Sequence, residues 1–328
     1  MNFPAASPEL HTSSDEDPLV GIEIGGTKLQ IVLGGQPPAI IDRWRASADQ
    51  RGGGTAIQQQ ITDGLSTLLR GRTPQAVGVG FGGPIDVTAG RIRLSHQIDG
   101  WEGFPLRDWL QQITGCPVAV ENDANTAALG EAIHGAGRER DPVFYCNFGS
   151  GVGGGFIVGG NIYHGRPPGE MEFGHLRNSM NDRDGTVEGE CSGWVIDRAL
   201  REAARATPHG PLARRLGNAV GGEAKHVAAL IADGDRQTND ILSAACDVIA
   251  FNLSHVVHLL NPAAIVIGGG LAMIGEPLRA MVASALPRFV MEALHPVPEV
   301  RLAALGEDAV PVGALELAAR IATIEIPY

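Results

Sequence analysis

The feature that most limits what this chain can fold into is a strand, a glycine-centred turn and a second strand, a unit that occurs twice. Residues 19–35, LVGIEIGGTKLQIVLGG, have apolar, β-branched runs on both sides of a glycine turn, which predicts a hairpin. Residues 143–160, VFYCNFGSGVGGGFIVGG, repeat this plan, with Gly149 in the place that Gly25 has in the first copy. A recurrence of this kind favours two domains built alike.

The rest of the chain alternates strand-like and helix-like segments. Further strands are expected within residues 76–86, 116–123 and 263–270, and helices over residues 55–69, 124–133, 194–206, 244–260 and 312–324. This alternation predicts α/β layers. With 328 residues, 44% of them hydrophobic, the chain is long enough for two domains of ordinary size.

Composition excludes several partners. A net charge of −12 opposes attraction to nucleic acid phosphates and to anionic lipid, so we expect no nucleic acid partner and no membrane partner. The opening residues 1–18 lack a basic region and an apolar run, so they are expected to be a short disordered acidic tail. The cysteines are far apart without a C-x-x-C pair, which favours a reduced, cytoplasmic protein. They are Cys116, Cys146, Cys191 and Cys246.

The glycine turns suggest phosphate binding. A G-x-G-x-x-G pattern occurs at residues 78–83 and again at residues 149–154, but a dinucleotide fold requires a helix after the last glycine, and strand-like sequence follows instead. A tight hairpin turn that presents successive backbone N–H groups is another kind of anion site. Two such turns facing each other could hold the phosphates of a nucleotide, while the alternative is that these glycines serve only the turns.

Six segments in order resemble the ROK family (repressors, open reading frames and kinases), sugar kinases of the actin-like ATPase superfamily. They are EIGGTK at 23–28, FGGPID at 81–86, VENDANTAALGE at 120–131, GSGVGGG at 149–155, EFGH at 172–175 and NPAAIVIGGG at 261–270. The resemblance covers nearly the whole chain from Leu19 and implies an α/β fold with two actin-like (ribonuclease H-like) domains flanking a cleft. The expected domains are 19–132, closed by a C-terminal helix 310–328, and 133–309.

Phosphoryl transfer to a sugar hydroxyl needs a group that accepts the hydroxyl proton. Asp123 follows an apolar strand and precedes a helical run, which places its carboxylate where α/β folds usually bind ligands. On local sequence alone, the alternative is an N-cap aspartate. The resemblance makes Asp123 the catalytic base and Asn122 a ligand of a sugar hydroxyl. Glu121 is expected to have a supporting role.

The resemblance also assigns the nucleotide site. The phosphates are expected at Gly25, Gly26, Thr27, Gly149, Ser150 and Gly151, and the adenosine at Gly268, Gly269 and Gly270. Lys28 is left out of the site, because on the strand that leaves the turn it can point elsewhere. The family usually has aspartate where this chain has Glu23, a position linked to the cation and its waters. We expect ATP and Mg²⁺ as cofactors, and whether Glu23 changes the metal geometry is left open.

Sugar contacts are implied for Glu172 and His175 of the Glu-x-Gly-His motif and for Glu188 in TVEGECSG, which is similar to the family's CLEayaSG. Together with Asn122 and Asp123 they would surround one hexose with polar groups, which distinguish hydroxyl stereochemistry. Glu170 is a rival for Glu172. The alternative for residues 172–194 is a solvated acidic loop.

Most ROK kinases carry a structural zinc held by the histidine of this motif and three cysteines. The corresponding positions here are Ser179, Asn181 and Thr186, none of them a cysteine. Neutral oxygens replace thiolates poorly as zinc ligands. We expect a zinc-free loop, with rescue by Asp182, Asp184 or Glu190 as the alternative.

The sequence therefore predicts an ATP-dependent hexose kinase with glucose as the leading acceptor. Fructose, mannose and N-acetylated hexosamines, including N-acetylmannosamine, are alternative acceptors. A transcriptional regulator is the alternative of another class, although the expected tail is too short for a helix-turn-helix domain. A non-catalytic sugar sensor is a third possibility. The family also implies a homodimer.

Overall fold

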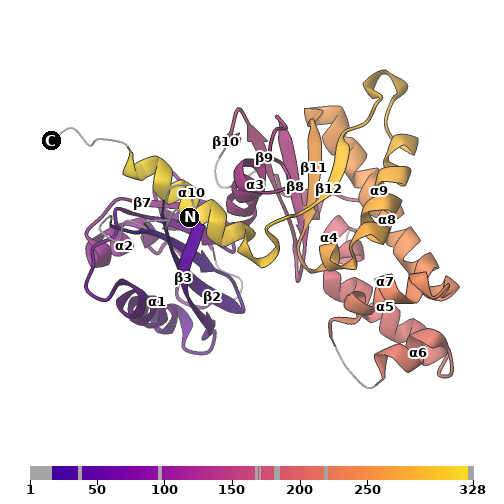
Figure 1. Ribbon diagram of the computed structural model, residues 1–328, viewed down its shortest axis with the longest axis horizontal. Coiled ribbons are helices and arrows are strands. Elements are labelled where there is room, and N and C mark those ends of the chain that lie inside the picture. The colour runs from indigo at the N-terminus through magenta and orange to yellow at the C-terminus, as the bar shows by residue number, and fades with distance from the viewer. Residues whose placement is uncertain are drawn as a thin grey trace, which may run out of the picture.

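The computed structural model describes residues 17–35, 39–94, 98–166, 169, 171–180, 185–217 and 221–323. Within these residues, two five-stranded sheets form the frame of the protein (Figure 1). The expected tail lies outside the described residues except for Asp17 and Pro18, whose carbonyl oxygens accept hydrogen bonds from Gln75. Residues 324–328 of the expected C-terminal helix also lie outside them.

The first sheet has the order β3-β2-β1-β4-β7. β1 pairs antiparallel with β2 and parallel with β4, and β4 pairs parallel with β7. Every residue of β4 is buried, as expected for a parallel strand covered on both faces. The strands are β1 (Leu19–Ile24), β2 (Lys28–Gly35), β3 (Ala39–Ser47), β4 (Ala76–Phe81) and β7 (Val118–Asn122).

Two helices complete the core of the first half of the protein, which is the part built around the first sheet. α1 (Gly53–Leu69) and α2 (Leu106–Thr114) pack their apolar residues into the same cluster as the strands. In α1 the buried positions include Ile57, Ile61 and Leu65, at the i, i+4 spacing of one helix face. A small ribbon of β5 (Ile85–Asp86) and β6 (Arg91–Ile92) lies between β4 and α2 in the sequence.

The second sheet has the order β10-β9-β8-β11-β12 and repeats the antiparallel hairpin followed by parallel strands. α8 and α9 lie on the face turned away from the first sheet (Figure 1). The elements are β8 (Val143–Phe148), β9 (Val152–Val158), β10 (Asn161–Ile162), β11 (Ala264–Gly268), β12 (Glu299–Leu302), α8 (Arg236–Leu260) and α9 (Glu276–Ala285). The second half also contains the helices α4 (Val187–Cys191), α5 (Gly193–Ala206), α6 (Pro211–Leu216) and α7 (Val227–Ala232).

α8 is, among the described residues, the one helix whose length and composition would allow it to cross a membrane. More than half of its most apolar window, 56%, is buried inside the protein. Its apolar residues, among them Leu242, Ile249 and Leu253, belong to the large core cluster of the second half. α8 is therefore a core helix in this structure.

α3 (Asp123–His134) and α10 (Ala309–Ala322) connect the two halves. α3 lies on the face of the second sheet that is turned to the first half (Figure 1), and its alanines pack with Val143, Tyr145 and Val266. α10 packs on the first sheet, where Leu315 and Ala318 join the core. Both halves therefore meet along these two helices.

The two helices approach each other closely because glycine stands at their contact. A Cβ atom added to Gly313 would lie 1.8 Å from the carbonyl oxygen of Thr126, and one added to Gly130 would lie 2.5 Å from that of Ala309. The buried carboxylate of Glu131 also accepts three backbone N–H groups, from Ala136, Ala304 and Leu305, at 2.7–3.0 Å. Ala136 follows α3, and Ala304 and Leu305 precede α10. The Glu131 carboxylate therefore joins the two segments in which the chain passes from one half to the other.

The expected α/β layers are confirmed, and each expected helix is present with small differences at its ends. The largest difference is α8, which begins at Arg236 rather than at residue 244. The side chain of Asp235 accepts the N–H of Thr238 at 3.1 Å and caps the helix there. The elements that were not predicted are the strands β3, β6, β10 and β12 and the helices α2, α4, α6, α7 and α9.

Candidate active site

The centre of the site is the junction of β7 and α3. Asn122, the last residue of β7, is the N-cap of α3, and its side-chain oxygen accepts the N–H groups of Ala124 and Asn125 at 2.9 and 3.3 Å. Its side-chain nitrogen donates to the carbonyl oxygen of Gly83 at 3.3 Å. The alternative in which Asp123 is the N-cap is wrong, because Asn122 has that position and Asp123 begins the helix.

Asp123 has the most strongly perturbed carboxyl group of the site. Protein surrounds it closely, and this desolvation raises its pKa to about 6, although the N–H of Ala124, at 2.8 Å, favours the ionised form. The carboxylates of Glu23 and Glu172 raise the pKa further. Asp123 is therefore ionised at neutral pH but more basic than an ordinary aspartate, which suits a proton acceptor.

The first glycine turn joins β1 to β2 and lies beside Asp123. The N–H of Gly25 donates to the carbonyl oxygen of Lys28 at 2.9 Å, and the carbonyl oxygen of Thr27 accepts the N–H of Ala48 at 3.1 Å. The carbonyl oxygen of Gly26 accepts the side-chain amide of Gln50. These contacts fix the turn on both sides.

Gly82 links this turn to Asp123. A Cβ atom at Gly82 would lie 3.3 Å from Oδ2 of Asp123 and 3.5 Å from the Cα atom of Gly25. The carboxylate of Asp123 and the first glycine turn are thus separated by little more than the backbone of Gly82.

Glu23 is held in place by two donors. Lys28 Nζ lies 3.0 Å from Oε1 of Glu23, and the side-chain amide of Gln30 donates to Oε2. The Lys28 side chain therefore points back to Glu23. Gln30 is fully buried and accepts Nε of Arg45 at 2.9 Å, so the position of Glu23 depends on a hydrogen-bonded row across β1, β2 and β3.

The second glycine turn joins β8 to β9. The N–H of Gly149 donates to the carbonyl oxygen of Gly151 at 2.9 Å, with Ser150 at the tip. Oε2 of Glu188, on α4, accepts the N–H of Val152 at 2.9 Å and would lie 2.8 Å from a Cβ atom at Gly151. The expected sugar ligand Glu188 therefore contacts the second glycine turn.

The glycines expected at the adenosine lie next to that turn. Gly268 is the last residue of β11, and Gly269 has a φ of +78°. A Cβ atom at Gly269 would lie 2.6 Å from the carbonyl oxygen of Phe148, the residue before Gly149. Gly270 begins the short 3₁₀ helix that follows. The two turns are therefore neighbours, as one nucleotide site requires.

A small pocket lies at the end of β7, on the side of Asn122. It is lined by Glu121, Asn122, Asn125 and Glu172 together with Pro84, Ile85, Val87 and Gly169. Its free volume of about 20 Å³ is enough for one water molecule. Glu172 is exposed and precedes the 3₁₀ helix Phe173–His175. His175 and Glu188 are described by the structure but do not line this pocket. Glu170, the rival of Glu172, lies outside the described residues.

The loop expected to be zinc-free is held by hydrogen bonds. Residues 176–178 and 185–187 pair through Asn178 N–H to Gly185 O at 2.8 Å and Val187 N–H to Leu176 O at 3.0 Å. The hydroxyl of Thr186, at an expected zinc position, caps α4 by accepting the N–H of Gly189 at 3.1 Å. Asn181, Asp182 and Asp184 lie outside the described residues. That this loop binds no zinc stays a prediction.

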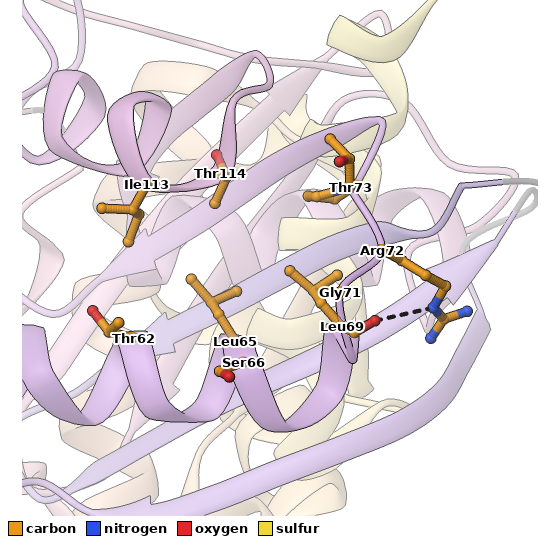
Figure 2. A pocket seen from close by; sticks show the side chains of 10 residues that line it. Thr62, Leu65, Ser66, Leu69, Gly71, Arg72, Thr73, Ile113 and Thr114 are labelled. Atoms are coloured by element: carbon orange, nitrogen blue, oxygen red, sulfur yellow. Dashed lines mark hydrogen bonds between the residues drawn. The ribbon is translucent and has the colours of Figure 1, made fainter.

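A separate cavity of about 310 Å³ lies in the first half, where α1 and α2 end (Figure 2). Leu65 and Leu69 of α1 face Ile113 and Thr114 of α2 across it, and Arg72 closes one side by donating to the carbonyl oxygen of Leu69 at 3.2 Å. The residues expected at the active site are absent from its lining.

Sequence reasoning missed two partners of the site. His164, after β10, lies 3.2 Å from the buried carboxylate of Glu121, and Gln30 holds Glu23. Gln30 could have been found from its polar side chain within the apolar strand β2. His164 could not, because its partner is far away in the sequence.

The duplicated hairpin sheets, with α3 and α10 between them, define an α/β protein of the actin-like (ribonuclease H-like) ATPase fold. The family model described as "ROK family" matches residues 19–321, and the chain belongs to this family.

Similar proteins agree with this assignment. A glucokinase of Halalkalibacterium halodurans is 30% identical over 306 residues, 90% of this chain and 92% of that protein. A glucokinase of Thermotoga maritima is 29% identical over 91% of this chain and 96% of that protein. The crystal structure of a ROK family glucokinase from Streptomyces griseus in complex with glucose and AMPPNP has a TM-score of 0.80 and 30% identity, and covers 92% of this chain and 99% of that chain.

Proposed function

We propose that this protein transfers the γ-phosphoryl group of ATP to a hexose hydroxyl, with glucose as the acceptor and glucose 6-phosphate as the product. The observation that carries the proposal is the carboxyl group of Asp123, which lies beside the first glycine turn and whose pKa is raised to about 6. The similar glucokinases support the choice of glucose.

Asp123 is the proposed catalytic base. Oδ1 is held by the N–H of Ala124, and Oδ2 faces Gly82, so the carboxylate has a fixed orientation toward the first glycine turn. A base whose pKa lies just below neutral pH accepts a hydroxyl proton well while remaining ionised. The proton of the attacking sugar hydroxyl moves to this carboxylate as the sugar oxygen bonds to the γ-phosphorus and the bond from that phosphorus to the β–γ bridging oxygen breaks, which releases ADP.

The two glycine turns are the proposed phosphate contacts, through backbone N–H groups and the side chains of Thr27 and Ser150. Gly268, Gly269 and Gly270 leave room for adenosine beside the second turn. Carboxylate oxygens suit Mg²⁺, and the carboxylate of Glu23 is close enough to Asp123 to raise its pKa. Glu23 would hold Mg²⁺ with its waters, and the ion would neutralise phosphate charge when bound.

The proposed sugar contacts are Asn122, Asp123, Glu172, His175 and Glu188. Asn122 and Glu172 line one small pocket. His175 and Glu188, which lie outside its lining, would contact the sugar from beyond this pocket.

Two further features belong to the proposal. The domains are residues 19–132 with the helix from 310, and residues 133–309, and sugar closes the cleft between them. The protein works as a homodimer in the cytoplasm; its four cysteines are all free and buried, which fits a reducing compartment. Light scattering on the purified protein tests the dimer.

The experiment that tests the function is ADP release with ATP and Mg²⁺ over a panel of glucose, fructose, mannose, N-acetylglucosamine and N-acetylmannosamine. We expect the highest kcat/KM with glucose. A higher kcat/KM for another sugar would show that this sugar, rather than glucose, is the acceptor. Sugar binding without turnover on any member would instead identify a sensor or regulator.

A further inference from the structure

His164 and Glu121 form a polar contact beside the proposed sugar pocket. Nε2 of His164 lies 3.2 Å from Oε2 of Glu121. The Glu121 side chain is 3% exposed and that of His164 is 42% exposed, so a buried carboxylate meets a histidine at the surface. The two residues come from different sheets, since Glu121 belongs to β7 and His164 follows β10.

Glu121 is connected to the residues of the reaction centre. Its Oε1 accepts the backbone N–H of Asn122 at 2.8 Å and the side-chain amide of Asn125 at 3.1 Å. Glu121, Asn122 and Asn125 all line the pocket. The position of the Glu121 carboxylate therefore affects the wall of the pocket and the backbone next to Asp123.

His164 is placed by the second sheet. The preceding residue, Tyr163, donates its N–H to the carbonyl oxygen of Phe156 at 2.8 Å and packs its ring against the Phe156 ring. The hairpin of β9 and β10 thus places His164. Gly169 and Glu172, which come later in the sequence, are also among the residues that line the pocket.

We propose that His164 is a positioning residue, which through the carboxylate of Glu121 holds the wall of the pocket that Asn122 and Asn125 form at the end of β7. The proposal rests on the proposed hexose kinase activity. Donors to a buried carboxylate matter more than surface ion pairs, because the carboxylate has lost its water. Removing His164 should therefore weaken sugar binding and leave the base Asp123 in place.

Steady-state kinetics of H164A test this. We expect KM for the sugar to rise ~10-fold, the effect of losing one charged hydrogen bond, with kcat and KM for ATP within ~3-fold of wild type. H164Q, whose amide nitrogen reaches a similar place and donates at every pH, should restore KM to within ~2-fold. H209A removes an exposed histidine elsewhere and should change nothing.

A double-mutant cycle with E121Q shows whether His164 acts through Glu121. In the E121Q background, H164A should raise KM for the sugar by less than ~2-fold. An equal rise in both backgrounds, or an unchanged KM in H164A alone, would overturn the proposal. A lower melting temperature in H164A with unchanged KM would show a purely structural role and would overturn it too.

Amide hydrogen exchange of the sugar-free protein gives a measurement that does not depend on activity. Residues 163–166 should exchange faster in H164A than in wild type and H209A, and H164Q should restore the wild-type rate. If the wild-type protein phosphorylates no sugar, the proposed function is wrong. Unchanged hydrogen exchange in H164A would, independently of activity, show that the positioning role of His164 is wrong.

Discussion

The carboxylate of Glu188 accepts the backbone N–H of Val152 at 2.9 Å, at the end of the second glycine turn. A residue expected to bind sugar thus also touches the turn expected to bind phosphate. In the proposed reaction, the two substrates would share this side chain.

Substitution E188A should therefore raise KM for both ATP and the sugar, by ~10-fold each, because one charged hydrogen bond to the turn and one to the sugar are lost. E172A, which changes the pocket but not the turn, should raise only KM for the sugar. Initial-rate kinetics with both substrates varied check this; an unchanged KM for ATP in E188A would contradict it.

Substitution D123N should lower kcat by about 10²-fold or more while sugar affinity stays near normal, since the amide cannot accept the proton. In wild type, kcat/KM should rise with pH as the Asp123 carboxyl, whose pKa is about 6, ionises, and level off above pH 7. D108N, an exposed aspartate of α2, is the control. A kcat for D123N within a few-fold of wild type would remove Asp123 from the role of base.

Ionisation of Asp123 should also lower the stability of the folded protein. Its folded pKa of about 6 lies above the ordinary value of 3.8, so the folded protein binds more protons between these pH values than the unfolded chain. Stability therefore falls as pH rises from 4 to 6, by ~2–3 kcal/mol from this group. D123N should raise the melting temperature at pH 8 but not at pH 3.5. Equal melting temperatures of D123N and wild type at pH 8 would count against it.

Sugar should close the cleft between the two sheets, because the γ-phosphate has to be shielded from water until the acceptor is in place. Small-angle scattering should show a smaller radius of gyration with glucose than without. The variant E172A/E188A at the same glucose concentration should stay open. Identical scattering of wild type in both states would speak against closure.

The loop after Glu172 should contain no zinc. Elemental analysis of protein purified without a polyhistidine tag should give far less than one zinc per chain after dialysis, because Thr186 caps α4 and neutral oxygens bind zinc weakly. Near-stoichiometric zinc that survives dialysis would show that another ligand set exists.

Local sequence was enough to predict the two hairpins and the β7–α3 junction, because glycine turns and an Asn-Asp pair between strand and helix are local signals. The start of α8 at Arg236 was missed although Asp235 is a good N-cap, since the apolar periodicity becomes clear only farther along. The pairs His164–Glu121 and Glu188–Val152 could not be predicted. Their partners are distant in the sequence, and only the folded topology brings them together.

The place of α10 also has a consequence for how the protein is made. Its residues Leu315, Ala318 and Ala319 share a core with Leu19 and Val32, and the backbones of Gly313 and Thr126 touch. The first half therefore cannot complete its core from its own contiguous segment. On the ribosome the second half emerges and can fold before α10 is available. The amino-terminal sheet, although synthesised first, is completed last.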